Sequence, residues 1–280
     1  MERGLSERQA CLLVHLPRAT FRYTTSVSDR ESEADLLERL RAIKSKRARV
    51  GYRMATHLVR RQTGNPLNPK RVYRLWKQEG FAVGRRVKKK RLTGPKQERP
   101  ETALRPNHVW TVDFIQDQTM TGRKLRFLTV TDEFTRESLA IVVNLSLPAE
   151  RVKATLDAVI GQRSAPSFLR CDNGPEFIAL VLRGYLVGKG VKTAYIDPGS
   201  PWQNGFAESF HSRIRDEFLS QEVFLSLSDA RVRVGIWRKW YNQERPHSSL
   251  SYQTPKEFAE DHNHKAGSLK VAETNSHDGT

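Results

Sequence analysis

Residues 109–115 read Val-Trp-Thr-Val-Asp-Phe-Ile, an apolar run with one carboxylate, Asp113, inside it. The β-branched and aromatic residues of this run predict a strand over residues 108–116. A second apolar run, residues 168–172, ends in Asp172 and is followed by Asn173 and Gly174. Burying a carboxylate at a strand end costs free energy unless a partner or a metal ion compensates it. Two such carboxylates on separate strands therefore favour a shared cation.

A third carboxylate, Glu208, lies in a segment with helical periodicity, with thirty-five residues between it and Asp172. At 100° per residue, Glu208 projects about 140° from the centre of an apolar stripe, and His211 and Arg215 lie near it in rotation. We expect the stripe to pack on the sheet and these three polar side chains to point away from it. The stripe consists of Phe206, Phe210, Ile214 and Phe218.

The start of this helix has the residues of a capping box. Ser200, Pro201 and Gln203 fit the N-cap, N1 and N3 positions. A lone Glu on such a helix would be interpreted as an exposed residue weakly paired with an arginine. The presence of Asp113 and Asp172 favours the functional interpretation instead.

The remaining pattern predicts an α/β fold. Three consecutive strands are followed by alternating helices and strands, which is typical of one mixed five-stranded sheet flanked by helices. Gly174 is expected to allow a tight turn after Asp172 and to leave room for a bulky ligand. The further strands are expected at 124–132, 137–144, 167–172 and 191–196, and the further helices at 148–162, 176–187 and 228–242.

The segment before residue 106 is expected to be helical and basic. Helices are predicted near 6–16, 32–46, 52–62 and 69–79, with Gly80 ending the last of them. The basic run 85–91 carries too little apolar surface to fold alone. We therefore predict a helical region over 1–92, a linker over 93–105, an α/β core over 106–225, a helical extension over 226–262 and a tail over 263–280.

The excess positive charge is confined to this N-terminal part. Residues 1–105 contain 27 Lys and Arg against 10 Asp and Glu, a net charge of +17, whereas residues 106–280 contain 21 of each. A one-sided excess of this kind is typical of a protein that grips a polyanion. A basic tail that only improves solubility is the alternative.

Several classes of protein are disfavoured by the composition. Cys11 and Cys171 are the two cysteines, too few for a disulfide scaffold or a four-ligand zinc site. Cys171 is expected to be an inert buried thiol. No apolar run approaches the ~20 residues that span a bilayer, and no secretory signal is recognisable. We expect a cytoplasmic protein.

Three carboxylates on rigid elements suit phosphoryl transfer with Mg²⁺. This ion prefers oxygen ligands and is bound by a few carboxylates together with water and substrate phosphate. Two such ions about 3.5–4 Å apart can activate the attacking oxygen and stabilise the leaving oxygen of a displacement at phosphorus. Asp113, Asp172 and Glu208 are the predicted metal ligands and catalytic residues.

Four motifs now carry a resemblance to a known family. Residues 110–114, 171–177 and 200–210 resemble the catalytic core of retroviral-type integrases and DDE transposases, and residues 241–255 resemble the C-terminal signature of bacterial insertion-sequence transposases. In this group the catalytic half is encoded by a second reading frame. The likeness covers about residues 5–260. Cys171 stands where Ser or His is common, and Arg215 stands where many relatives have Lys.

The resemblance implies a ribonuclease-H-like fold, the Asp113, Asp172 and Glu208 triad, and dependence on two Mg²⁺ ions that Mn²⁺ can replace. It further implies a bacterial, nucleoid-associated protein that acts on element terminal repeats and target DNA. Assembly as a homo-oligomer on paired DNA ends, and a possible partner protein from an upstream frame, follow from the same resemblance. The zinc module of retroviral integrases is absent from this sequence.

The N-terminal region resembles the helix-turn-helix-like part of the same group. Its basic side chains would contact phosphates, although they could equally be solvated residues of helices packed on the core. Trp202 and Asn204 could hold DNA, or be a core residue and a local cap. The predicted DNA contacts are Arg215, Trp202, Asn204, Arg60, Arg61, Lys70, Arg71 and Arg74, with Arg53 a further candidate.

The leading hypothesis is a DNA transposase that cleaves and joins element ends. A ribonuclease-H-like nuclease is the second hypothesis, against which the basic arm and the C-terminal signature argue. A catalytically silent DNA-binding regulator is the third, and the intact triad argues against it.

Overall fold

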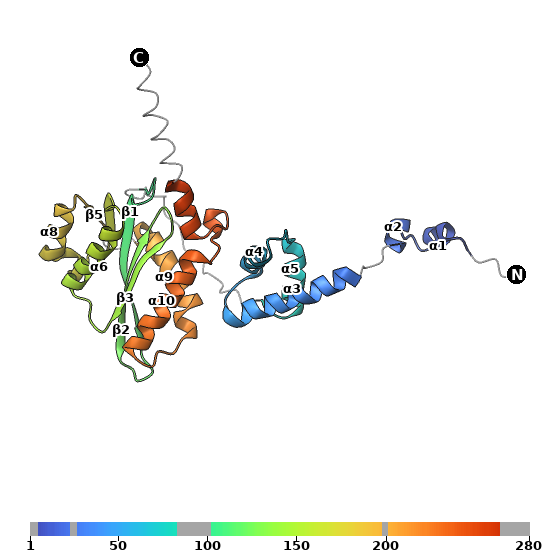
Figure 1. The fold of residues 1–280 in the computed structure, drawn as a ribbon, viewed down its shortest axis with the longest axis horizontal. Coiled ribbons are helices and arrows are strands. Elements are labelled where there is room, and N and C mark those ends of the chain that lie inside the picture. Colours follow the sequence, from blue (N-terminus) through green and yellow to red (C-terminus); the bar gives the residue numbers. More distant parts are fainter. Residues whose placement is uncertain (1–4, 23–26, 83–101, 198–200, 264–280) are drawn as a thin grey trace, which may run out of the picture.

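The computed structural model describes residues 5–22, 27–82, 102–197 and 201–263. A five-stranded sheet with helices packed on it forms the larger body, and a smaller helical module lies beside it (Figure 1). The strand order is β3-β2-β1-β4-β5. The strands are β1 (Val109–Gln118), β2 (Lys124–Asp132), β3 (Ser138–Asn144), β4 (Phe168–Cys171) and β5 (Lys192–Tyr195).

The sheet is mixed, as the sequence predicts. Strands β1, β2 and β3 form an antiparallel meander, whereas β4 pairs parallel with β1 and β5 parallel with β4. In the β1–β4 register Thr111 lies beside Arg170. Extending this register by two residues brings Asp113 toward Asp172, which directly follows β4. The parallel pairing of β1 and β4 therefore explains why two carboxylates far apart in sequence lie side by side on the sheet.

Alternation along β1 sends its side chains into two different cores. Trp110 and Val112 pack in the core under α6 (Ala149–Gln162), α7 (Pro175–Ile178) and α8 (Leu180–Gly188). Ile115 packs in the opposite core, together with α9 (Gly205–Glu217) and α10 (Leu227–Gln243). Asp113 has the parity of Ile115 and therefore faces α9, the helix that carries Glu208.

Helix α9 is fixed on the sheet by part of the predicted apolar stripe. Phe210, Ile214 and Phe218 are buried in the core with Trp237 and Tyr241 of α10. The Phe210 and Tyr241 rings meet edge to face, with centroids 5.2 Å apart. This packing fixes the rotation of α9 and leaves Glu208 exposed.

The helical module has its own small core. Leu40, Val59, Leu75 and Trp76 are buried there. Asn68 caps α5 by accepting a hydrogen bond from the Lys70 backbone N–H (2.9 Å). The helices before the sheet are α1 (Glu7–Leu13), α2 (Arg18–Phe21), α3 (Val27–Lys46), α4 (Tyr52–Thr63) and α5 (Pro69–Gln78).

The module contacts the C-terminal part of the larger body through side chains of α4 and of the residues after α3. The imidazole of His57 stacks on the Tyr252 ring, with centroids 3.7 Å apart. Arg61 forms a salt bridge with Glu257. The guanidinium of Arg47 lies 3.9 Å from the centroid of the Trp240 ring.

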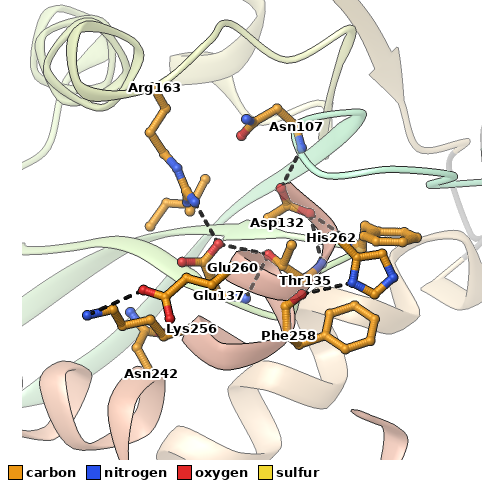
Figure 2. A network of polar contacts seen from close by, with 12 residues as sticks. Asn107, Asp132, Thr135, Glu137, Arg163, Asn242, Lys256, Phe258, Glu260 and His262 are labelled. Carbon is orange, nitrogen blue, oxygen red and sulfur yellow. Dashed lines mark hydrogen bonds and ion pairs between the residues drawn. The ribbon is translucent and has the colours of Figure 1, made fainter. Parts of the chain in front are cut away.

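The turn between β2 and β3 anchors the C-terminal extension (Figure 2). Asp132 accepts hydrogen bonds from the backbone N–H groups of Asn107 (2.8 Å), Phe134 (2.8 Å) and Thr135 (3.1 Å). Asn242 of α10 accepts a hydrogen bond from the Ser138 backbone N–H. Asp132 therefore has a structural role.

Most predicted elements are confirmed to within a few residues, with three differences. Helix α3 begins at Val27, five residues before the predicted start, because no helix breaker precedes its apolar positions. The helix expected at 176–187 is interrupted at Ala179, whose backbone is extended. Residues 201–204 form a 3-10 turn, so α9 begins at Gly205.

Some predictions fall outside the described residues. These are the basic run 85–91, most of the linker 93–105, nearly all of the tail 263–280, and Ser200. Within the described residues, no helix has the length and apolarity needed to cross a membrane.

Candidate active site

Asp113 is the most enclosed of the three predicted ligands and is held by its neighbours. Its Oδ1 accepts a hydrogen bond from the Phe114 backbone N–H (2.7 Å). The Asn204 amide donates to its Oδ2 (3.3 Å), and His211 Nδ1 lies 3.7 Å from the same oxygen. These contacts fix the carboxylate at the surface of the sheet beneath α9.

The negative charges of Asp113, Asp172 and Glu208 influence one another. Burial is the main cause that raises the pKa of Asp113 to about 6, and repulsion from Asp172 and Glu208 raises it further. The hydrogen bonds from Phe114 and Asn204 act in the opposite direction. The two other carboxylates are therefore close enough to destabilise the ionised form of Asp113.

Asp172 and Glu208 are exposed, in contrast to Asp113. Asp172 follows β4, and its Oδ1 accepts the Gly174 backbone N–H (2.9 Å). Glu208 stands in the first turn of α9. Within the part of the chain that is described, no three His, Cys, Asp or Glu side chains are close enough together to hold a metal ion. The three carboxylates influence one another electrostatically but are not gathered around one point.

Gly174 has a spatial role rather than the conformational one expected from sequence. Its φ of −59° is accessible to any residue, so the turn does not require glycine. A Cβ at this position would lie 2.9 Å from Oδ1 of Asp172. The missing side chain therefore gives the Asp172 carboxylate its room.

His211 is the residue that sequence analysis placed wrongly. It does not point away with Glu208: its side chain is 13% exposed, and Nε2 lies 3.0 Å from the Thr129 hydroxyl. Burial, with a smaller effect of Arg215, lowers the pKa of His211 to about 4. The neutral ring bridges β2 and Asp113. The signal was its proximity on the helix to Ala207, Phe210 and Ile214, which are all buried.

Gln203, the predicted N3 residue of a capping box, bonds to Asp197 instead, and the predicted N-cap residue, Ser200, lies outside the described residues. Gln203 accepts the Asp197 backbone N–H and donates to the Asp197 carboxylate, both at 2.9 Å. Asn204 is buried against Asp113, and its Oδ1 has no hydrogen-bond partner among the described residues. DNA contact by Asn204 stays a prediction, although its observed partner is a carboxylate. The Trp202 side chain lies outside the description.

The predicted DNA-contacting residues are not equally available. Arg215 is exposed on α9, and Lys70 is exposed at the start of α5. Arg60 donates to the Leu67 carbonyl, Arg61 pairs with Glu257, and Arg74 pairs with Glu33. Arg71 is half-buried, whereas Arg53 is exposed and donates to the Tyr52 hydroxyl (3.1 Å). None of these contacts tests DNA binding, and all of these residues stay predictions.

A buried ion pair lies next to the site, and sequence analysis did not find it. Arg170 of β4 donates to the Glu133 carboxylate (2.7 Å), and both side chains are almost fully buried. The Thr111 hydroxyl donates to the same Glu133 oxygen (2.5 Å). Cys171, the next residue, is buried as expected, and burial together with the nearby aspartates raises the pKa of its thiol to about 12.

Comparison with known proteins decides the family. Two models described as an integrase core domain match residues 103–201 and 189–255, and an HTH-like domain model matches residues 31–90. An uncharacterized 31.7 kDa protein of insertion element IS407 from Burkholderia multivorans is 41% identical over 261 residues, which are 92% of each chain. The chain belongs to the integrase-core family of insertion-sequence transposases.

A more distant relative and a solved structure agree with this family and its fold. The putative transposase InsK of insertion sequence IS150 from Escherichia coli is 26% identical, with 87% of this chain and 89% of the relative covered. A chain of the simian T-cell lymphotropic virus intasome, in complex with a PP2A regulatory subunit, superposes with a TM-score of 0.50 at 13% identity, covering 73% and 74% of the two chains. The fold is ribonuclease-H-like, as the motifs implied.

Proposed function

We propose that this transposase-family protein cleaves DNA at the ends of an insertion sequence and joins those ends to target DNA. The observation that carries the proposal is the common electrostatic environment of Asp113, Asp172 and Glu208, because each of the other two raises the pKa of Asp113. In the reaction, a water or a 3′-hydroxyl attacks a DNA phosphodiester and the bond to the leaving 3′-oxygen breaks.

The donor set fits divalent ions. Three carboxylates supply the oxygen ligands that Mg²⁺ prefers, and a cation would relieve the repulsion that they now exert on one another. Bound Mg²⁺, in a pair that Mn²⁺ could replace, would supply charge stabilisation at the attacking and leaving oxygens. Holding an ion requires the exposed Asp172 and Glu208 side chains to turn toward Asp113.

The chain's own residues orient this donor set. The Phe114 N–H, Asn204 and His211 hold Asp113, and the Gly174 N–H holds Asp172. Because His211 is neutral, it can orient the Asp113 carboxylate without competing as a cation. The packed stripe of α9 gives Glu208 a fixed origin on the other side of the site.

The N-terminal helical module would supply DNA affinity. It belongs to residues 1–105, which hold the positive charge excess of the chain, and an HTH-like domain model matches residues 31–90. Arg215, seven residues after Glu208, would contact a phosphate close to the reaction. The partners are the element's terminal repeats and target DNA, with a homo-oligomer holding paired ends.

The test is a strand-transfer assay with full-length protein, terminal-repeat DNA and Mg²⁺. Asp113→Asn, Asp172→Asn and Glu208→Gln should each lower joining by about a thousandfold, since each removes several kcal/mol of stabilisation. Asp117→Asn is the matched control, because Asp117 lies on β1 and accepts the N–H of the next residue as Asp113 does. Equal joining by wild type and all three triad variants would exclude the proposal.

Chelation separates this function from its alternatives. EDTA should abolish both cleavage and joining, and Mg²⁺ should restore them. Cleavage of RNA–DNA hybrids without any joining of DNA ends would favour a nuclease instead. DNA binding with no chemistry in Mg²⁺ would favour a silent regulator.

A further inference from the structure

Arg213 of α9 lies where three hollows of the surface meet. One hollow is shared with Glu208 and Ser209. A second is shared with Tyr52 and Arg53 of the helical module. Arg213 is partly buried, and among the described residues no hydrogen bond or ion pair engages its guanidinium. A partly buried cation between the module and the site calls for an anionic partner.

The third hollow is a cavity of about 220 Å³ beneath Arg213. This is far more than the roughly 10–15 Å³ that one enclosed water requires. Gly205, the first residue of the 13-residue helix α9, lines it, so the positive end of the helix dipole lies at this region. Ser209, Arg136 and His247 also line the cavity.

His247 supplies an independent sign that the cavity receives a ligand. Its side chain is 3% exposed, and its Nε2 has no hydrogen-bond partner among the described residues. Burial, followed by the charges of Arg245, Arg213 and Arg136, lowers the pKa of His247 to about 2. The ring is therefore neutral without a ligand; because Nδ1 donates to the Tyr241 backbone carbonyl, Nε2 is the nitrogen left for a ligand, and an anion there would favour the protonated ring, whose Nε2 donates.

The acidic residues that line the cavity are already matched. Asp132 accepts three backbone N–H groups, and Glu133 pairs with Arg170. Arg136 lies over the Phe206 ring, 3.9 Å from its centroid, which leaves its positive charge in place. The charge that remains uncompensated is therefore positive, supplied by Arg213 and the positive end of α9.

We propose that this cavity binds one backbone phosphate of the DNA strand that passes between the helical module and Glu208, with Arg213 as its main contact. The inference rests on the proposed function and adds a positioning residue to it. A phosphate at Arg213 lies between α4 and the hollow of Glu208, so it sets which phosphodiester reaches the carboxylates. Because the contact is to the backbone, it carries no base preference.

The first experiment measures binding by the full chain carrying Asp113→Asn, without Mg²⁺, so that catalysis plays no part. Arg213→Gln should weaken binding about tenfold, to a terminal-repeat duplex and a random duplex alike. The slope of log affinity against log salt should fall by about 1, the value for one lost phosphate contact. Arg183→Gln, an exposed arginine of α8, is the control and should change neither. Unchanged affinity and slope in Arg213→Gln would overturn the proposal.

The second experiment locates the phosphate. Uncharged methylphosphonates are placed one at a time along the terminal-repeat strand. At one position the methylphosphonate should weaken DNA binding by the protein with Arg213 intact. The same substitution should not weaken binding by Arg213→Gln any further. His247→Gln should reduce the penalty at the same position, with an unchanged thermal midpoint as the check on folding. Independent, additive penalties at every position would contradict a contact between Arg213 and one phosphate.

The outcome is separable from that of the proposed function. If the triad variants join DNA normally but the methylphosphonate coupling is found, the phosphate site stands and the proposed chemistry fails. If the triad variants are inactive and the coupling is missing, the phosphate site alone fails.

Discussion

The carboxylate edge, where Asp113 and Asp172 lie on the sheet, and the helical module formed by α3, α4 and α5 are held in place by different kinds of interaction. Asp113 sits on a central strand with buried neighbours on both sides, and α9 is packed by three buried apolar residues. The module is joined to the same body by a ring stack, a cation–π contact and exposed ion pairs. Exposed polar contacts contribute little free energy compared with buried ones.

This difference suggests a division of labour. The carboxylates need a fixed framework, and dense packing of β1 and α9 provides it. If the module engages DNA as proposed, weak contacts with the body would let its orientation adjust. The comparison can be tested by weakening each region in turn.

The largest effect is expected for a charge pair buried in the larger body. Glu217 accepts hydrogen bonds from both Nε and Nη2 of Arg245, whose side chain is 2% exposed. Glu217→Gln leaves that guanidinium buried without a counter-charge, which should cost about 3–5 kcal/mol in the free energy of unfolding. Urea denaturation measures the change. Glu257→Gln, which removes the exposed partner of Arg61, should cost less than about 1 kcal/mol. Equal losses would contradict the distinction between the two regions.

The next effect tests the space at the carboxylate edge. Gly174→Ala places a Cβ against Asp172 and should push the carboxylate out of position. We expect joining activity to fall about a hundredfold, because misplacement by about 1 Å has this effect in active sites. Gly184→Ala on α8 is the control, since its Cβ would meet no atom within 4 Å. Full activity of Gly174→Ala would show that the room beside Asp172 is not needed.

Part of the fold and of the candidate site could be predicted from the sequence. The apolar runs around Asp113 and Asp172 predicted their strands, and the resemblance of the motifs implied the fold. The stripe on α9 was right for Phe210, Ile214 and Phe218. His211 was misplaced because rotation around one helix does not reveal a neighbour from another element, here Thr129 of β2.

Other parts of the site depend on contacts that no local pattern contains. Asn204 reaches Asp113 across ninety-one residues, and Arg170 reaches Glu133 across the sheet. The role of Gly174 is set by the position of a neighbouring oxygen rather than by its own backbone angles. The arginines of the module stay undecided, because a cation that binds DNA and one that pairs with a surface carboxylate look alike in sequence.

A smaller effect is expected from pH at the contact between the module and the body. Burial, followed by the charges of Arg60 and Arg61, lowers the pKa of His57 below its ordinary 6.5. A free module would therefore bind more protons than a docked one. The stabilisation that the contact gives to docking is fully present above pH 6.5 and is lost as the pH falls below it. Hydrogen exchange in residues 52–63, corrected for its intrinsic pH dependence, should rise between pH 7.5 and 5.5 while β1 stays protected. His57→Gln should remove this dependence, and a pH response that persists in this variant would rule out His57 as its cause.

The smallest effect concerns the exposed salt bridge of the same contact. Hydrogen bonds from Arg61 are the largest cause that lowers the pKa of Glu257, so its stabilisation is present above pH 4.5 and is lost as the pH falls through the lowered value. At pH 7, Glu257→Gln should raise hydrogen exchange in α4 no more than about fivefold. Arg39→Gln removes a comparable exposed pair within α3 and serves as the control, with no expected change in α4. A larger rise than this would mean that the salt bridge, and not the ring stack, holds the module.

The most direct measurement is the anomalous scattering of Mn²⁺ in crystals of the full chain. We expect Mn²⁺ bound to the Asp113 carboxylate, with the Asp172 and Glu208 side chains turned toward the ion. Crystals of Asp113→Asn should contain no such ion. Mn²⁺ found only at other residues, with Asp113 still held by Asn204 and His211 alone, would contradict this expectation.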